Sequence, residues 1–274
     1  MSSNELQNIV VVGSGNVAEA IALACHDCPT LSLRQVVARN VERVSHIASM
    51  AECDWCANLA NAADADLYII AVSDRAVEEV ASSLRCKEGS VVVHTAGSIS
   101  QDAIPNQRRG VMYPFQTFTK GRRIDFSRVP LFIEGCDEQT TLQIEQVART
   151  LSRNVWRATS DCRRDIHLTG VLACNFVNAL YGMAADYLTE RQGLPFDVLC
   201  PLIEETASKA IDATHPSMVQ TGPAVRGDKE VSNRHQQMLR NDERKELIYK
   251  LQTYSILAFD ICKYSSINSI PIYL

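Results

Sequence analysis

The residues best suited to chemistry in this sequence form a cluster of small residues behind an apolar run near the start of the chain. Ile9-Val10-Val11-Val12 leads into Gly13-Ser14-Gly15-Asn16-Val17-Ala18, and a helical pattern begins at once behind it. Gly13 permits a sharp turn, Gly15 lets backbone N–H groups approach a ligand, and Ala18 lets the helix pack near the strand. The N–H groups at the start of such a helix lack intrahelical partners and attract phosphate. The pattern therefore predicts a dinucleotide site at residues 13–17.

A second polar group follows the next candidate strand. NAD sites usually carry an Asp or Glu at this point, which accepts a hydrogen bond from the ribose 2′-hydroxyl. This chain has Ala38-Arg39-Asn40, with Arg43 one turn further on. A guanidinium binds a 2′-phosphate through charge-assisted hydrogen bonds, whereas a carboxylate repels it. We therefore predict NADP rather than NAD, with Arg39 and Asn40 at the ribose; the alternative is a solvated arginine at a strand end.

Two further strand ends supply candidates for the same site. One apolar run ends in Ala71-Val72-Ser73, and another is followed by Thr95-Ala96-Gly97. Small residues at these strand ends let a cofactor lie against the backbone. Asp74 is expected to cap the helix behind it. His94 could donate a proton, because a histidine titrates near neutral pH. It could equally be a structural histidine bonded to a neighbouring carbonyl.

A long helical pattern beginning near residue 161 carries three polar residues among apolar ones. These are His167, Asn175 and Asn178, and such residues either line a cleft or bond buried backbone groups. Hydride transfer requires a group that stabilises or protonates the developing anion or amine. We expect His94, His167 and Asn175 to fill these roles.

Two loop segments also mix residue types that occur in sites. Tyr113-Pro114-Phe115-Gln116-Thr117-Phe118 suits either a pocket wall or a rigid buried loop. Arg226 and Asp228 lie in a later loop, where site residues are common, although they could simply bridge to one another.

The elements that must position these residues follow from apolar periodicity. Residues 5–157 alternate apolar strands with helical patterns, which is typical of a parallel sheet covered by helices. Strands are expected at 8–12, 35–38, 67–72, 90–94, 110–113, 131–134 and 154–157, with a less regular one at 55–57. Helices are expected at 16–24, 41–50, 76–84, 138–151, 161–191, 196–213, 231–239 and 243–264. We predict a Rossmann-like doubly wound α/β domain over residues 1–157 and an all-α domain over residues 158–274.

Composition narrows the class of protein. Apolar residues make up 46% of the 274-residue chain and the net charge is −5, which fits a globular protein and disfavours a nucleic-acid partner. Apolar runs fall short of the roughly 20 residues that a membrane span needs. The first residues lack the basic and apolar regions of a signal peptide. These features predict a cytoplasmic protein with no membrane partner.

The ten cysteines are expected to be reduced thiols in that compartment. Cys25-x-x-Cys28 and Cys53-x-x-Cys56 have the spacing of a four-thiolate zinc site, but both pairs fall at the far end of the expected sheet from the glycine-rich turn. Scattered buried thiols are the favoured interpretation, and we expect no metal. The apolar tail at residues 267–274 is expected to pack on a partner or on its own domain.

The chain resembles a bacterial family that joins a Rossmann-like NADP-binding domain to a helical domain of unknown function. The likeness rests on residues 13–18, 71–74 and 94–98 and on the loop Thr221-Gly222-Pro223-Ala224-Val225-Arg226-Gly227-Asp228. More distantly the chain is similar to pyrroline-5-carboxylate reductase and to deazaflavin-dependent NADP oxidoreductases. The resemblance implies NADP binding, hydride transfer in the cleft between domains, and homodimerisation through the C-terminal helices.

Catalytic features of two related groups are missing. Pyrroline-5-carboxylate reductases carry a Ser-Gly-Ser-Gly-Pro-Ala-Tyr turn where this chain has Val171-Leu172-Ala173-Cys174-Asn175-Phe176-Val177. The lysine that β-hydroxyacid dehydrogenases place four residues before an asparagine is replaced by Val171 or Cys174. We therefore predict an NADP-dependent oxidoreductase that transfers a hydride to or from a small carbonyl or imine substrate. The alternative is a non-catalytic NADP-binding regulatory or partner-binding protein.

Overall fold

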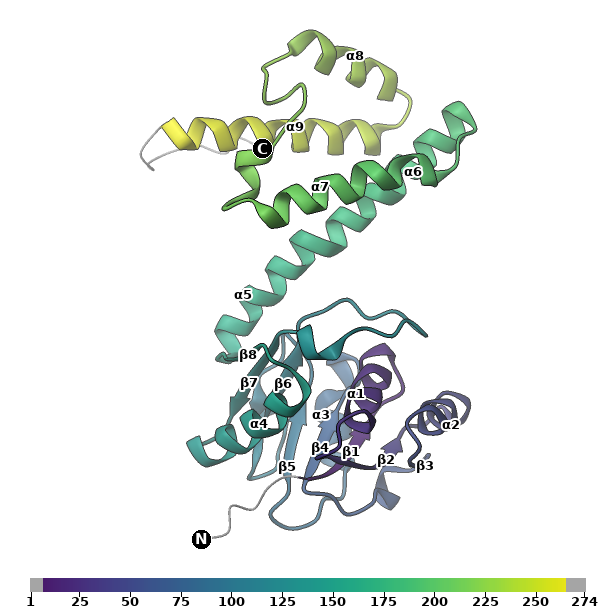
Figure 1. Cartoon of the computed structure of the whole chain (residues 1–274), viewed down its shortest axis with the longest axis vertical. Coiled ribbons are helices and arrows are strands. Elements are labelled where there is room, and N and C mark those ends of the chain that lie inside the picture. Colours follow the sequence, from purple (N-terminus) through teal and green to yellow (C-terminus); the bar gives the residue numbers. More distant parts are fainter. Residues whose placement is uncertain (1–6, 265–274) are drawn as a thin grey trace. The chain divides into compact units, whose positions relative to one another are not determined.

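The computed structural model describes residues 7–264, with side chains over residues 7–256 (Figure 1). The chain divides into two compact units, Met1–Val177 and Asn178–Leu274. Residue 157, where strands were expected to give way to helices, is the end of the last strand. The first compact unit continues beyond it because the next helix packs back onto the sheet. The expected apolar tail lies outside the described residues.

The first unit is built on an eight-stranded sheet with the order β3-β2-β1-β4-β5-β6-β7-β8. The strands are β1 (Asn8–Val12), β2 (Ser32–Val37), β3 (Asp54–Cys56), β4 (Leu67–Ile70), β5 (Val91–His94), β6 (Arg109–Pro114), β7 (Leu131–Gly135) and β8 (Val155–Arg157). All neighbours run parallel except β6 and β7, which are antiparallel. The chain doubles back there because no α-helix lies between these strands to carry it across the sheet.

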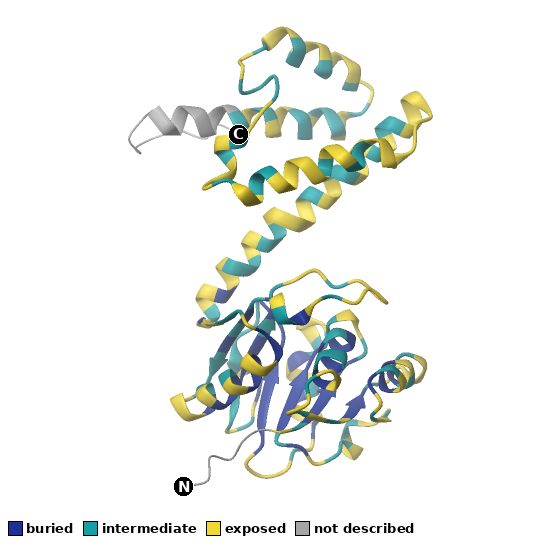
Figure 2. Cartoon of the chain, viewed as in Figure 1, coloured by how far each residue is buried: buried dark blue, intermediate teal, exposed yellow. Residues whose placement is uncertain are grey.

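Helices cover both faces of this sheet, so the predicted α/β class is confirmed. They are α1 (Asn16–His26), α2 (Val41–Met50), α3 (Val77–Ser83) and α4 (Glu138–Leu151). Alternate residues of β1 face opposite sides, as strand geometry requires. Ile9 and Val11 join a core with α1, α2 and α4, whereas Val10 and Val12 join a second core with α3. Figure 2 shows the central strands buried between the helices.

A long helical segment follows β8. It consists of α5 (Ser160–Gly170), a π-helical stretch (Val171–Asn175) and α6 (Phe176–Gln192), close to the single helix predicted over residues 161–191. Gly193 ends it with a positive φ of 66°. The helices α7 (Cys200–Asp212), α8 (Lys229–Leu239) and α9 (Glu243–Tyr264) complete the second unit. The expected all-helical region is therefore confirmed.

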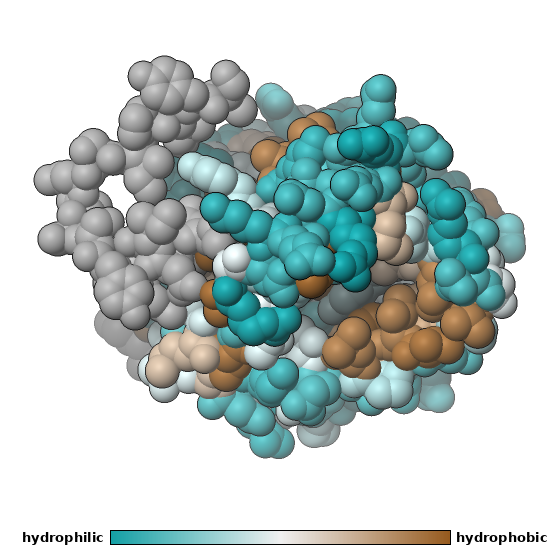
Figure 3. Space-filling view, turned by 90° about the horizontal axis from the view of Figure 1, so that it is seen from above, coloured by the Kyte–Doolittle hydropathy of each residue, from teal (hydrophilic) through white to brown (hydrophobic). Residues whose placement is uncertain are grey.

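The second unit leaves its apolar side chains open. No residue between 178 and 256 is buried (Figure 2). Leu202, Ile211 and Met218 are 65%, 81% and 68% exposed, and Figure 3 shows hydrophobic residues among the hydrophilic ones on the molecular surface. The segment Ser160–Gln192 also has the length and composition of a membrane-crossing helix, and the most apolar part of it is not buried. This differs from the sequence expectation, which counted only uninterrupted apolar runs. Apolar surface of this kind is typical of an interaction face.

Candidate functional site

The carboxyl ends of β1, β2 and β4 surround two adjoining hollows. The first, the turn pocket, has a volume of about 530 Å³ and is lined by Ser14, Gly15, Asn16, Val17, Ala71, Val72, Ser73, Gln116 and Phe118. The second, the ribose pocket, measures about 640 Å³ and includes Gly13, Arg39 and Asn40. Ser14, Val72 and Ser73 line both pockets. The structure therefore brings residues 13–17, 39–40 and 71–73 to one place, as the sequence predicted.

The two glycines of the turn do different work. Gly13 has a φ of +138°, and a Cβ atom there would lie 2.1 Å from the carbonyl oxygen of Ala71. Its N–H donates to the carbonyl of Val37 at 2.8 Å, so the turn locks β1, β2 and β4 together. Gly15 has an ordinary φ of −78°, and a Cβ atom there would meet nothing within 4 Å. Gly13 is required by the fold, whereas Gly15 keeps the turn pocket open.

The start of α1 fits the pyrophosphate of a dinucleotide. Gly15 is the N-cap residue, and no side chain accepts from the N–H groups of the first turn. Uncapped N–H groups at a helix start require an acceptor, and they carry the positive end of the helix dipole. The open space at Gly15 lies beside these groups. The observed backbone thus fits the cofactor that the fold family implies.

The residues that follow β2 differ in whether they face a pocket or bond to the protein itself. The Arg39 side chain is exposed and makes no hydrogen bond or ion pair with the described residues. Asn40 caps α2, because its Oδ1 accepts from the Arg43 N–H at 3.0 Å. Arg43 is absent from the ribose pocket: its Nε donates to the Ser14 carbonyl at 3.3 Å, and its Nη2 pairs with Glu19 at 2.7 Å. Arg43 therefore braces the turn, and Arg39 is the cation that faces the ribose pocket.

His94 is fully buried at the end of β5. Its Nδ1 accepts from the Ala96 N–H at 3.1 Å, which leaves Nε2 to donate to the Ser100 carbonyl at 3.2 Å. Burial lowers the pKa of His94 to about 4. A ring with both nitrogens bonded to backbone has no proton to exchange with a substrate. These bonds favour the structural alternative for His94 over the catalytic one.

A different histidine meets the same edge of the sheet. His167 on α5 has its Nδ1 3.0 Å from the Tyr113 hydroxyl at the end of β6. Both rings pack on Gly97, where a Cβ atom would lie 2.7 Å from His167 Nδ1 and 2.8 Å from Tyr113 Cζ. Thr95 and Ala96 are buried beneath this contact and line neither pocket. Gly97 therefore serves close packing of the pair.

Tyr113 was not singled out from the sequence as a chemical group. It belongs to the aromatic segment that suited either a pocket wall or a rigid loop. The signal that could have found it is topological, because β6 lies beside β5 and its end falls next to Gly97. Burial raises the pKa of Tyr113 to about 12, so its hydroxyl stays protonated at neutral pH.

A buried arginine sets the position of α5. Arg163 is fully buried, and it pairs with Glu134 of β7 at 2.7 Å and donates to the Ile99 carbonyl at 2.6 Å. Glu134 also accepts from the Ser160 N–H and hydroxyl at 3.2 and 2.9 Å. These bonds tie the first turn of α5 to the sheet. His167, one turn after Arg163, is thereby held against Tyr113.

Asp74 does not cap the next helix as expected. The short 3₁₀ turn Asp74–Ala76 begins behind Ser73, and the Asp74 carboxylate instead accepts from the Ser98 hydroxyl. This bond joins the connection after β4 to the one after β5. It therefore links the residues of the turn pocket to the segment that packs on Tyr113 and His167.

The remaining candidates are more scattered. Asn175 is exposed within the π-helical stretch, and its side chain makes no hydrogen bond to the described residues, whereas Asn178 belongs to the second unit. Asp228 caps α8 by accepting from the Val231 N–H at 3.1 Å. Over the described range it forms no ion pair with Arg226, so the two do not bridge. π-helical stretches occur often beside functional sites, which keeps Asn175 a candidate.

The cysteine pairs do not form a metal site in the part of the chain that is described. Nine cysteines there are free thiols, and no group of three or more His, Cys, Asp or Glu side chains could hold a metal ion. Cys25 is buried, and Cys28, Cys53 and Cys56 are partly buried. Cys28 and Cys53 pack against the same apolar core as Cys25, so these three thiols are neighbours.

We expect His94 to make stability depend on pH. Its pKa falls from 6.5 to about 4 on folding, so the unfolded chain binds the proton more tightly. His94 should not affect the free energy of unfolding above the unfolded pKa of 6.5. As pH falls from 6.5 to the folded pKa of about 4, the free energy of unfolding should decline by on the order of 3 kcal/mol. Urea denaturation across that window measures it. His94→Gln should flatten the decline, whereas replacing the exposed His26 should not; an equal decline in both variants would contradict the assignment.

Two family models match the chain, and the boundary between them does not coincide with the boundary between the two compact units. Residues 8–97 match the family described as NADP oxidoreductase, coenzyme F420-dependent, and residues 129–256 match a domain of unknown function, DUF2520. No functionally curated protein matches the sequence.

Solved structures extend the likeness over nearly the whole chain. A crystal structure titled as a putative NADP oxidoreductase from Bacteroides fragilis is 36% identical, with a TM-score of 0.83 over 94% of this chain and 100% of its own. The pyrroline-5-carboxylate reductase of Streptococcus pyogenes shares 13% identity and a TM-score of 0.58 over 92% of this chain and 98% of its own. An imine reductase from Myxococcus stipitatus, solved with NADP⁺, shares 15% identity and a TM-score of 0.58 over 91% and 92%.

The two reductases are similar in fold alone, whereas the Bacteroides protein is a relative in sequence over its full length. This chain therefore belongs to the family of that protein. In this chain, the segment that matches an NADP oxidoreductase domain precedes the segment that matches a domain of unknown function.

Proposed function

We propose that this protein is an NADP-dependent oxidoreductase that transfers a hydride to or from a small carbonyl or imine. The observation that carries the proposal is the His167–Tyr113 hydrogen bond of 3.0 Å, formed at the sheet edge that also holds the turn pocket. A nucleotide site alone would need no such pair. The cytoplasm is the proposed location, and the free thiols of the described residues accord with its reducing conditions.

The first unit supplies the residues that would hold the cofactor. The N–H groups of residues 15–17 would bind the pyrophosphate, and Arg39 would bind the 2′-phosphate. NADP, when bound, supplies or accepts the hydride. The chain's own task is then to position the substrate and to exchange the proton that balances hydride transfer.

His167 is the group proposed to exchange that proton. With its Nδ1–H donating to the Tyr113 oxygen, the ring presents Nε2 as the remaining acid or base. In reduction, Nε2–H gives its proton to the carbonyl oxygen or imine nitrogen, and the imidazolium becomes a neutral ring. In oxidation, Nε2 accepts that proton. Tyr113 remains a phenol throughout because burial raises its pKa to about 12, so it acts by orienting the ring.

Substitution of the pair tests this assignment. His167→Ala should lower kcat by about 100-fold or more, the usual contribution of a general acid. Tyr113→Phe should lower it by about tenfold, because the ring stays near but loses its orientation. Both variants should retain NADPH binding. The measurement is NADPH oxidation with a panel of small ketones, aldehydes and cyclic imines.

His26→Ala, which changes an exposed histidine at the end of α1, is the matched control and should leave kcat unchanged. Full activity of His167→Ala would contradict the proposed role. If NADPH binds to the wild-type protein but no member of the panel is reduced, the result favours the alternative of a non-catalytic NADP-binding protein. The absence of the lysine and of the Ser-Gly-Ser-Gly turn is the observation that keeps this alternative open.

The preference for NADP is tested at Arg39. A charge-assisted hydrogen bond to phosphate contributes about 1.5–3 kcal/mol, so Arg39→Ala should weaken NADPH binding by about tenfold or more and leave NADH binding nearly unchanged. Arg34, exposed on β2 and outside both pockets, provides the control Arg34→Ala. Titration by cofactor fluorescence measures the affinities of the wild-type protein and of both variants for NADPH and for NADH. Equal losses for NADPH and NADH would refute the phosphate contact.

We also propose that the chain is a homodimer through its helical unit. That unit has no buried residue over its described side chains, so its apolar surface lacks a cover within the described chain. Light scattering should give twice the chain mass of 30.3 kDa at low micromolar concentration. A stable mass of one chain would reject self-association.

A further inference from the structure

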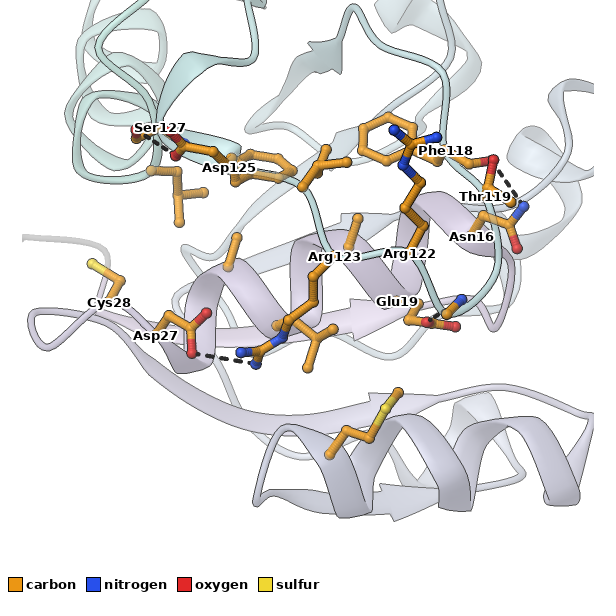
Figure 4. A pocket seen from close by; sticks show the side chains of 18 of the residues that line it. Asn16, Glu19, Asp27, Cys28, Phe118, Thr119, Arg122, Arg123, Asp125 and Ser127 are labelled. Atoms are coloured by element: carbon orange, nitrogen blue, oxygen red, sulfur yellow. Dashed lines mark hydrogen bonds and ion pairs between the residues drawn. The ribbon is translucent and has the colours of Figure 1, made fainter. Parts of the chain in front are cut away.

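A further hollow of the first unit adjoins the turn pocket. It has a volume of about 720 Å³ and runs along the face of α1 that is turned away from the sheet (Figure 4). Ala18, Ile21 and Ala22 of α1 pack into the core, whereas Ala20, Leu23 and Ala24 line the hollow. We call it the α1 pocket. Its volume lies in the range of about 300–1,000 Å³ that small-molecule sites occupy.

The connection between β6 and β7 forms the opposite wall of this pocket. Phe118, Ile124 and Phe126 of that connection supply apolar surface across from α1, and Met50 of α2 and Leu151 of α4 extend it. Figure 4 shows the connection passing along α1, from Asn16 to the end that carries Asp27 and Cys28. The wall is held there by hydrogen bonds from Asn16 Nδ2 to the Phe118 carbonyl, at 3.0 Å, and from the Gly121 N–H to Glu19, at 3.2 Å. The pocket is thus an apolar slot whose wall is fixed by polar bonds.

Its acidic residues are already satisfied. Glu19, with a side chain only 8% exposed, pairs with Arg43 at 2.7 Å besides accepting from Gly121. Asp125 accepts from the N–H and hydroxyl of Ser127 at 3.1 and 2.6 Å. Asp27 faces Arg123 at 3.7 Å. Among the charged side chains that line the pocket, Arg122 alone makes no hydrogen bond or ion pair with the described residues.

An apolar slot with one uncompensated guanidinium selects a particular kind of ligand. Its apolar walls favour a hydrocarbon body, and Arg122 favours a carboxylate or a similar anion. We propose that the α1 pocket is a second small-molecule site, which binds an amphipathic anion with its apolar body along α1 and its acidic group at Arg122. Asn16 and Phe118 line both this pocket and the turn pocket, so the two ligands would be neighbours. The proposal does not depend on catalysis.

Cys28 provides a reporter inside the pocket. It lines the end opposite Asn16, whereas Cys162 is exposed on α5 and outside the pocket. The experiment is alkylation of the full-length protein by iodoacetamide, read for each cysteine by peptide mass, with decanoate as the probe below its micelle-forming concentration. Decanoate should slow alkylation of Cys28 in a saturable way and leave Cys162 unaffected. Decyltrimethylammonium, with the same chain and the opposite charge, should protect neither.

The variant Arg122→Gln should raise the half-protecting concentration of decanoate by about tenfold, the loss expected for one charge-assisted contact. Arg128→Gln is the matched control, because Arg128 belongs to the same connection but does not line the pocket. It should leave that concentration unchanged. Any one of three results would overturn the proposal: no protection of Cys28, equal protection by the cation, or an unchanged half-protecting concentration in Arg122→Gln. Parallel protection of Cys162 would also overturn it, because it would mean a general detergent effect.

Discussion

The buried contact of Arg163 with Glu134 is the interaction on which the arrangement of the candidate site depends. A guanidinium that is fully excluded from water must be matched by acceptors, and Glu134 and the Ile99 carbonyl supply them. Removing one partner of such a pair costs about 3–5 kcal/mol, because the other charge stays buried. The first turn of α5 is consequently tied to β7 and to the segment after β5. This tie sets the position of α5, and it thereby supports the contact of His167 with Tyr113.

The two sides of the candidate site use different chemical groups, backbone on one side and side chains on the other. The nucleotide side relies on backbone: a glycine that tolerates contact with Ala71, an uncapped helix start, and a turn braced by Arg43. The side for which we propose proton exchange relies on the side chains of Tyr113 from β6 and His167 from α5, which are separated by 54 residues in the sequence. The bond between Asp74 and Ser98 joins the two sides.

Most elements of the first unit could be predicted because their apolar patterns reflect local geometry. The strands and the helices α2 and α4 fall where the sequence placed them. The reversal between β6 and β7 could not be predicted, since strand direction depends on how the connecting segment packs. His94 and His167 could not be ranked from the sequence, because a histidine's type and position do not show what its ring nitrogens contact. The structure separates them: His94 is buried and both of its ring nitrogens bond backbone groups of Ala96 and Ser100.

By itself, the sequence determined the nucleotide turn, the cation at the end of β2 and the succession of an α/β region and a helical one. Each depends on a few adjacent residues, whose types largely determine the local backbone geometry. The tertiary structure decided what these residues do. It turned Arg43 toward Glu19 and left Arg39 open, buried His94, and joined Tyr113 to His167. Those outcomes depend on which segments, distant in the sequence, come into contact in the folded chain. Hydrogen bonds between residues far apart in the chain produce no periodic pattern in the sequence.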